Sequence, residues 1–531
     1  MTANMNRVPN VGEVAELMRR AFAASADPTA LNPHYDSTSG KYDNLGDWLA
    51  LRKDGLVYGV KVPLFAYSPV TTAIKTGANA GLVLEASTET AAGQNDYKGK
   101  ALFECIRVNG GVGTDGMPYV TAIEGYDDRF DPKANNTYAL TPVYYRKVTN
   151  DGSYITYEYT DTPRTGFTPC FGAYTSGGTL RPYILRACYM DSDGAFSSKS
   201  GTQPAGSAGS PTAVSHCANN DFSWSKTRAS TDGLTFLTYG DVAYQMDFMQ
   251  LMLGVKAPRT KAVGCVDYNL TYTVAAAETG VKRAIVTDAQ AANIILGSSV
   301  SVGATGRAAN DTVKCAKVLS KTALGNGNTA INLDLASNVD IASTDKLVTM
   351  PWRNGTCDGI LGTFGARTTA ALTNGKEPYR FQNIEYNLGI WEVLCDMFSI
   401  CSDASGLPKH EWYVAPDVSA CSSVNGSTGW TKLNTATTAA TNNAWNYIKD
   451  QACERGARFP SNVGGSSTQG YCTAWHPGSA ASASRELVVG GNLSNGAYAG
   501  AGCAASDHSL SGTGWGIGGR SSAIGHSAQA E

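Results

Sequence analysis

Apolar and polar residues alternate at every second position through much of residues 56–198. The stretches that carry this alternation are separated by clusters of Gly, Asp, Asn and Pro, and they read LVYGVKVPLFAY, KALFECIRV, YALTPVYYRKV, SYITYEYT and RPYILRACYMD. Successive side chains of a β-strand point to opposite faces of a sheet, so this period between turn residues is typical of strands. The pattern predicts an antiparallel β-rich domain over residues 51–200.

A helical period marks residues 11–25 instead. The apolar residues of this stretch fall on one stripe, opposite Glu13, Glu16, Arg19 and Arg20. A short amphipathic helix has to bury its stripe, either on the body of its own chain or on symmetry-related copies. We interpret residues 1–50 as a helical N-terminal segment that attaches the protein to a larger assembly.

A second helix is predicted to begin at Thr238. Asp241 follows three residues later, as in a capping box, and Gly254 supplies a stop. Three methionines share one face of this helix, and we expect them to pack in a core rather than to form an adaptable binding surface. A further amphipathic helix is predicted over residues 442–458.

The remaining patterns suggest how the chain is divided. A Gly/Ser/Pro-rich stretch predicts a linker at residues 201–219. Residues 265–350 return to β patterning, with a short helix predicted at AQAAN. After them the aromatic-rich, strand-like pattern of the earlier residues resumes. We therefore interpret residues 265–350 as a β-rich insertion in a domain that spans residues 220–531.

Residues 490–520 interleave two kinds of position. They read GGNLSNGAYAGAGCAASDHSLSGTGWGIGGR, where Ser, Asn, Ala, Thr, Tyr, Asp and His fill the gaps between glycine and apolar anchors. Antibody loops use such small hydrogen-bonding side chains and occasional aromatics to bind many targets on one scaffold. Changing an exposed side chain costs within about 0.5 kcal/mol, whereas changing a buried anchor costs several. We interpret the segment as a recognition surface on a stiff framework, whose positions are Gly490, Gly491, Gly500, Trp515, Gly518, Gly519 and Arg520.

Composition and charge narrow the classes of function. The chain has 531 residues, of which 16% are charged and 58 are Gly, and its length suggests about three domains. A formal charge of -3 without a dense Lys/Arg run argues against a nucleic-acid partner. No apolar run approaches the roughly 18 residues that cross a bilayer, and MTANMNRVPN lacks the hydrophobic core of a signal peptide. We therefore expect that the protein does not insert into a membrane. We also expect that it is assembled in a bacterial cytoplasm.

Residues suited to catalysis or metal binding are few. The thirteen cysteines contain no CxxC pair, so we expect them to be reduced and partly buried. Asp507 and His508 are adjacent, as in half of a metal site or an acid/base pair, but the other histidines fall in no ligand spacing. We assign no catalytic residue, metal or cofactor. Arg520 is expected to pair with carbonyls or with a carboxylate such as Glu385. We also expect Trp475 to be exposed, together with Tyr471 and His476.

Four motifs occur in order: NIEYNLGIWE, RFPSNVGGSSTQGYCTAW, RELVVGGNLSNGAYAGAGC and WGIGGR. Together they resemble the C-type-lectin-fold variable proteins diversified by retroelements, in particular those of phage tail tips, which are related in fold to the phage major tropism determinant. The resemblance covers about residues 220–531 apart from the insertion. It implies a fold that is mostly β with some α, in which β-rich modules precede a C-terminal C-type-lectin-like (α+β) domain with a glycine-rich variable segment.

The resemblance also implies which positions vary. In such proteins the variable codons derive from adenine-containing template codons, which yield the residue types found between the anchors here. The EPN, QPD and WND motifs of calcium-dependent animal lectins are absent, and so is a recognisable pair of formylglycine-generating cysteines. The candidate ligand-binding positions are Asn492, Ser494, Asn495, Ala497, Tyr498, Ala504, Ala505, Ser506, Asp507, His508, Ser511, Gly512, Thr513, Gly516, Ser522 and Ala523.

These observations predict a receptor-binding protein of a phage tail tip or fibre, located in the virion. Its expected partners are a host cell-surface protein or glycan, and other tail proteins through the N-terminal region. A homotrimer is expected because tail tips are built on threefold axes. Two alternatives stay open: a virion-associated polysaccharide depolymerase, which needs two carboxylates about 5 to 10 Å apart such as Glu385 and Glu392, and a bacterial surface adhesin with the same variable domain.

Overall fold

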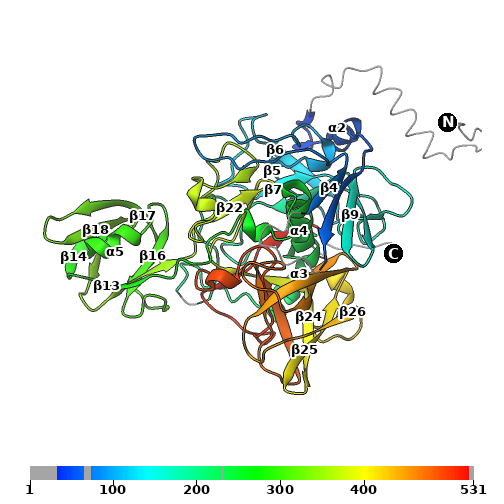
Figure 1. Ribbon diagram of the computed structural model, residues 1–531. Coiled ribbons are helices and arrows are strands. Elements are labelled where there is room, and N and C mark those ends of the chain that lie inside the picture. The colour runs from blue at the N-terminus through cyan, green and yellow to red at the C-terminus, as the bar shows by residue number, and fades with distance from the viewer. Residues whose placement is uncertain (1–32, 65–72, 208, 230, 232, 525–531) are drawn as a thin grey trace, which may run out of the picture.

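The computed structural model describes residues 33–64, 73–207, 209–229, 231 and 233–524. The helix expected at residues 11–25 lies outside these described residues. Strands in several sheets dominate the described part of the chain, with few helices (Figure 1). This confirms the mostly β, multi-sheet fold class, whereas the C-type-lectin-like assignment of residues 220–531 stays a prediction. Within the described residues no helix is both long and apolar enough to span a membrane.

Two sheets form the N-terminal part. After a small hairpin and helix, a five-stranded antiparallel sheet has the order β10-β8-β9-β3-β4. Tyr157 and Tyr159 alternate inward along β9 and are fully buried, as the period-two pattern predicts. The elements are β1 (Tyr35–Asp36), β2 (Lys41–Tyr42), α2 (Leu45–Leu51), β3 (Tyr58–Pro63), β4 (Ile74–Gly77), η1 (Ala101–Phe103), β8 (Tyr145–Asn150), β9 (Tyr154–Thr160) and β10 (Thr168–Pro169).

A six-stranded sheet joins the two ends of the chain, in the order β12-β33-β11-β7-β5-β6. Its short strand β33 comes from the C-terminal end, yet it pairs with both β11 and β12. Residues before and after the Gly/Ser/Pro stretch 201–219 therefore share one sheet, which fixes the end of the candidate segment to the N-terminal strands. The elements are β5 (Ile106–Val112), β6 (Pro118–Ile123), β7 (Thr137–Thr141), β11 (Ile184–Ala187), β12 (Thr235–Phe236) and β33 (Ser521–Ser522).

Helix α4 (Tyr239–Leu253) runs through the centre of the molecule, between the N-terminal sheets and the C-terminal part (Figure 1). It begins and ends as the sequence predicts. Asp241 N donates to Thr238 Oγ1 over 3.2 Å within a complete capping box, and Gly254 ends the helix in the left-handed region with φ 64. Its methionines are buried, so they belong to the core as expected. The shorter helix α3 (Ala218–Ala229) packs on strand β24.

Replacing Thr238 by Ala is expected to lower the free energy of unfolding by about 1 kcal/mol, because the first turn of α4 loses its cap. Urea denaturation of the two proteins measures the difference. Thr305→Ala, in an exposed turn of the insertion, is the control and is expected to change stability by less than about 0.5 kcal/mol. Equal stability of Thr238→Ala and the parent chain would contradict the role of the capping box.

The C-terminal part is built on a nine-stranded sheet that nearly closes into a barrel. Its end strands, β26 and β28, lie side by side, and Thr437 on β26 donates a hydrogen bond to the Pro460 carbonyl on β28. Trp412 and Trp475 fill the interior. The strands are β24 (Trp391–Ala404), β25 (Leu407–Val414), β26 (Thr431–Thr438), β27 (Asn446–Glu454), β28 (Ala457–Val463), β29 (Ala474–His476), β30 (Ala483–Val489), β31 (Ala504–Ala505) and β32 (Ile517–Gly518).

Two sequence predictions fail in this sheet. Residues 442–458 are not helical but contain strand β27 and the turn into β28, where Arg455 and Gly456 both have positive φ (47 and 83). Two successive residues of this kind make the tight turn that favours a hairpin. Trp475 and Tyr471 are buried rather than exposed, because Trp475 packs against Trp412 inside the sheet.

The insertion forms a small β module that projects from the body (Figure 1). It has its own six-stranded sheet, in the order β13-β20-β16-β17-β18-β15, and its own core, which includes Val300 and Ile331. The predicted AQAAN helix is present and confirmed. The elements are β13 (Thr271–Thr273), β14 (Glu278–Val281), β15 (Arg283–Thr287), α5 (Asp288–Asn293), β16 (Ser299–Gly303), β17 (Val313–Ala323), β18 (Asn328–Leu333), β19 (Val339–Ile341) and β20 (Lys346–Met350).

Short elements complete the chain around the candidate segment. A three-stranded sheet follows the insertion, and single 3-10 turns lie in the connecting loops. All thirteen cysteines are free, and twelve of them are buried, in line with the expectation from their spacing. The remaining elements are η2 (Pro258–Thr260), β21 (Phe364–Gly365), η3 (Ala370–Leu372), β22 (Tyr379–Phe381), β23 (Ile384–Tyr386), η4 (Val418–Ala420) and η5 (Gly496–Tyr498).

Candidate functional site

Residues 490–520 contain little regular structure, and their shape depends on close backbone approaches. At Gly491, with φ 105, an added Cβ would lie 2.3 Å from the Cβ of Ala499. At Gly519 an added Cβ would lie 2.6 Å from Nδ1 of His216. Atoms this close collide, so both glycines are required by packing, which agrees with their prediction as framework positions.

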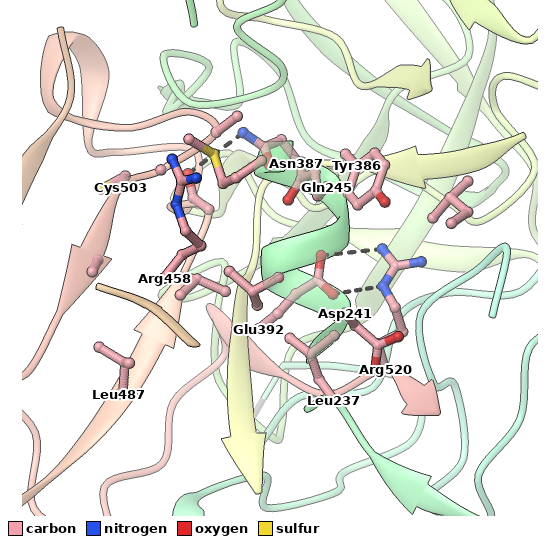
Figure 2. A pocket seen from close by; sticks show the side chains of 18 of the residues that line it. Leu237, Asp241, Gln245, Tyr386, Asn387, Glu392, Arg458, Leu487, Cys503 and Arg520 are labelled. Carbon is pink, nitrogen blue, oxygen red and sulfur yellow. Dashed lines mark hydrogen bonds and ion pairs between the residues drawn. The ribbon is translucent and has the colours of Figure 1, made fainter. Parts of the chain in front are cut away.

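Arg520 anchors the end of the segment in the core. Its Nε donates to Glu392 Oε2 over 2.6 Å and its Nη2 to Glu392 Oε1 over 3.1 Å, in a two-pronged pair that Figure 2 shows beside Asp241. The sequence predicted that Arg520 binds carbonyls or a carboxylate such as Glu385. The carbonyls are confirmed, because Arg520 donates to those of Ala187 and Glu385, whereas the carboxylate partner is Glu392 and not Glu385. Glu385 accepts from Arg520 through its backbone carbonyl, while its own carboxylate accepts from the amides of Gly355 and Cys357.

A small cavity lies between α4, β24, β30 and the candidate segment (Figure 2). Charged side chains line it, including Asp241, Glu392, Arg458 and Arg520. Its volume of about 40 Å³ holds a few water molecules but not a sugar ring or a peptide. This cavity is therefore too small to admit a macromolecular ligand.

A buried ion cluster supports the same end of the segment. His216 Nδ1 lies 2.9 Å from Asp221 Oδ1, and its Nε2 lies 3.3 Å from Asp191 Oδ2, with all three side chains excluded from solvent. Burial disfavours the charged ring, but the two carboxylates outweigh that effect and raise the pKa of His216 to about 10. Since Gly519 leaves space for this ring, the buried cation and the framework glycine depend on each other.

Glu486 lies beneath the loop of residues 507–513. Its Oε2 accepts a hydrogen bond of 3.0 Å from the Ala218 amide at the start of α3, whereas its buried Oε1 has no partner among the described residues. An added Cβ at Gly512 would lie 3.4 Å from that oxygen, so the loop covers it closely. Burial raises the pKa of Glu486 to about 8, with a smaller contribution from Asp221.

Glu486 is expected to make stability depend on pH. Its folded pKa of about 8 lies above the unfolded value, so its contribution is fully present below about pH 4.3 and is lost as the pH rises through 8. Relative to Glu486→Gln, the parent chain is expected to lose on the order of 5 kcal/mol of unfolding free energy across that window. Urea denaturation between pH 5 and about pH 8.5 measures the difference.

The quantity that tests this expectation is the difference in unfolding free energy between the parent chain and Glu486→Gln at each pH. His410, whose pKa burial lowers to about 4, weakens both proteins as the pH falls below about 6.5 and cancels in the comparison. The contribution of His216, which is lost as the pH rises from about 6.5 through 10, cancels in the same way. Parallel stability curves for the parent and Glu486→Gln would contradict this account.

The candidate positions divide into two groups by exposure. Ten lie on the surface or are half-buried: Asn492, Ser494, Asn495, Ala497, Tyr498, Asp507, His508, Ser511, Gly512 and Thr513. Six are buried, mainly because they belong to β31, to β33 or to the packing around them: Ala504, Ala505, Ser506, Gly516, Ser522 and Ala523. Only the first group is placed to contact a ligand directly.

The loop of residues 492–498 carries an aromatic column. Tyr498 stacks on Trp445, with ring centroids 5.1 Å apart and planes 6° apart, and Trp445 stacks in turn on buried Trp391 at 6.3 Å. Tyr447 lies 5.4 Å from Tyr498. We call Trp391, Trp445 and Tyr498 the aromatic column. Sequence reasoning missed it because it interpreted residues 442–458 as a helix, although Trp445 and Tyr447 at a spacing of two suit one face of a strand.

The loop of residues 507–513 lies next to this column. His476 contacts Trp445 edge-on at 5.0 Å, and its Nδ1 lies 3.6 Å from Asp507 Oδ2. His508 Nε2 lies 3.6 Å from the other oxygen of Asp507. The structure thus brings His476 to the Asp507–His508 pair, a proximity that spacing in the sequence did not indicate. No described residues form a group of three or more that fits a metal ion.

A comparison with protein-family models and a search of curated proteins found no match to this sequence. The likeness to retroelement-diversified proteins therefore rests on the four sequence motifs. What the structure adds is geometry. A chain of side-chain contacts links the two loops, from Tyr498 through Trp445 and His476 to Asp507 and His508. We call these five residues and the exposed positions of both loops the contact strip.

Proposed function

We propose that this protein is the receptor-binding protein of a phage tail tip or fibre, and that the contact strip binds a ligand on the host cell surface. The observation that carries the proposal is the alternation of anchors and exposed polar residues within one segment. Leu493, Ala499 and Cys503 are buried, while Ser494 and Ala497 between them are exposed. A surface of this kind changes its side chains at little cost to the fold.

The anchoring of the segment supports the same proposal. β32 pairs with β24, β33 joins the N-terminal sheet, and Arg520 holds Glu392 between them. Ligand binding by loops requires a scaffold that does not rearrange when the loops change. The C-terminal end of the segment is fixed by residues outside the contact strip, which supports that requirement.

Assembly would multiply weak contacts. In this proposal residues 1–50 attach the protein to the tail, and three copies present their contact strips together. Several linked sites raise overall binding by about a hundredfold to ten-thousandfold over a single contact. A small surface of hydroxyls, amides and one aromatic column then suffices for host attachment.

The depolymerase alternative draws no support from its two named carboxylates. Glu392 is paired with Arg520, and Glu385 accepts two backbone amides, so neither faces an open cleft. The adhesin alternative would use the same contact strip and differs only in what the N-terminal region attaches to. No observation on the site favours it over the phage protein.

Sequencing the 3′ end of the gene in a propagated population tests the proposal. We expect codons to differ between molecules at positions that match adenines in a nearby repeat, and the differences to concentrate at the exposed group, such as Ser494, Ala497 and Thr513. The framework codons for Gly491, Gly519 and Arg520 serve as the internal control and are expected to be constant. An invariant segment without a repeat would remove diversification and leave a surface of fixed specificity.

A further inference from the structure

A cation that has no carboxylate partner among the described residues lies where the insertion meets the candidate segment. Arg307 is in the loop between β16 and β17, and its guanidinium carbon lies 4.1 Å from the ring centroid of Trp515. Trp515 is half-buried, and nearby Thr513 is exposed. The insertion therefore supplies a charged side chain to the edge of the candidate segment.

The guanidinium is only partly satisfied. Both of its hydrogen bonds come from Nη2, to Asn269 Oδ1 over 2.6 Å and to the Thr349 carbonyl over 3.0 Å. Its buried Nε has no partner, and no acceptor contacts Nη1 in the part of the chain that the structure describes. Burial lowers the pKa of Arg307 to about 10, with no carboxylate acting against it. The charge is thus held beside Trp515, and no carboxylate of the described part of the chain pairs with it.

Other arginines of the body show what a completed contact looks like. Arg520 has Glu392, Arg458 has Asp247, and Arg186 has Asp241 within 2.9 Å. Those pairs lie inside the protein and stabilise the core, whereas Arg307 is half-exposed at the surface. Nη1 of Arg307 can therefore donate to a carboxylate that a ligand supplies, and the charge on both groups strengthens such a hydrogen bond.

We propose that Arg307, stacked on Trp515, binds the carboxylate of an acidic sugar in the host surface glycan. The inference rests on the proposed function and names the ligand class of that surface. A single guanidinium suits one carboxylate per sugar unit, whereas an acidic nucleic acid needs a dense basic face that this chain of net charge -3 lacks. Ser511, Thr513 and Asn492 of the same segment supply the hydroxyl and amide groups that bond sugar hydroxyls.

Titration calorimetry of the full chain with acidic polysaccharides tests the proposal. The probes are polyglucuronate, polygalacturonate and polysialate, each with its carboxyl-reduced neutral form, and polyglutamate as an acidic protein mimic. We expect at least one acidic polysaccharide to bind, its neutral form to bind at least about tenfold more weakly, and added salt to weaken the acidic complex. Arg307→Gln is expected to weaken that complex at least about tenfold.

Arg283→Gln is the matched control. It removes the same charge from the insertion at a site paired with Glu278, and it is expected to leave affinity within about twofold. Thermal melting and tryptophan fluorescence check that each variant is folded. If Arg307→Gln unfolds the insertion, Arg307→Lys decides instead: it keeps the cation but loses the planar fork, and a loss of at least about threefold supports the proposal while unchanged affinity overturns it.

The remaining outcomes separate this inference from the proposed function. Equal binding of acidic and neutral polymers, or unchanged affinity in Arg307→Gln, overturns the inference. Binding of polyglutamate alone, with the same dependence on Arg307, also overturns it and indicates a protein receptor. If no acidic polymer binds but the protein adsorbs to host cells through Tyr498, the inference fails and the proposed function stands. If the protein adsorbs to no host cell, both fail.

Discussion

Replacing Arg520 by Gln is expected to lower the free energy of unfolding by about 3–5 kcal/mol, because Glu392 is left buried without its counter-charge. The Glu392 side chain is 9% exposed and that of Arg520 is 4% exposed, so water cannot take over the role of the missing guanidinium. The same substitution also removes hydrogen bonds to the carbonyls of Ala187 and Glu385. These two bonds join the end of the candidate segment to β11 and β23, so the substitution also loosens the segment from both strands.

Denaturation with guanidinium chloride measures this loss of unfolding free energy. A double-mutant cycle then identifies its cause. Glu392→Gln combined with Arg520→Gln is expected to cost less than the sum of the single variants, since the double variant leaves no unpaired charge. Lys147→Gln is the control, because it breaks a surface pair with Glu158 and is expected to cost less than about 1 kcal/mol. An additive cycle, or a cost for Arg520→Gln near that of the control, would show that the pair is not the anchor.

The sequence was informative where structure depends on neighbouring residues. The cap at Thr238, the stop at Gly254 and the strands before residue 200 follow from local rules, and the structure has all of them. An added Cβ at Gly491 or Gly519, two of the predicted framework positions, would lie 2.3 or 2.6 Å from another atom, whereas Gly516, predicted to vary, is buried. Local chemistry therefore predicted the type of most elements before residue 200.

What the sequence could not supply was contact between distant residues. Arg520 pairs with Glu392 rather than Glu385, a choice set by the parallel pairing of β32 with β24. The helix expected at residues 442–458 failed because Trp445, Ile448 and Ala452 fit a helical face in isolation, while the turn at Arg455 and Gly456 favours a hairpin. The closing sheet then buries Trp475, which local context had placed in an exposed loop.

The exposure of the candidate positions depended on the same long-range pairing. Ala504 and Ala505 have the small side chains of variable positions, but β31 pairs with both β29 and β30 and encloses them. Ser522 is covered because β33 lies between β11 and β12. Residue type alone did not distinguish these positions from Ala497, which is exposed.

Replacing Tyr498 by Ala is expected to weaken attachment of the isolated protein to its host ligand by at least about 2 kcal/mol, or roughly thirtyfold. Tyr498 ends the aromatic column at the surface, and its position is fixed by stacking on Trp445 and by Arg259, whose Nε donates to the neighbouring Ala499 carbonyl. A rigid aromatic side chain held in place by its neighbours loses little entropy on binding, which is why such residues dominate interfaces.

Adsorption of the purified protein to host cells measures the effect, with Tyr498→Phe and Tyr126→Ala as controls. Tyr498→Phe keeps the stacked ring and is expected to retain most of the binding, whereas Tyr126 is 54% exposed but lies outside the contact strip and is expected to be neutral. Stability should fall by only about 1 kcal/mol in Tyr498→Ala, because the ring is half-buried. Unchanged adsorption in Tyr498→Ala would place the ligand elsewhere. Trp445 stacks on this ring, so a smaller residue at position 498 is expected to expose the face of Trp445.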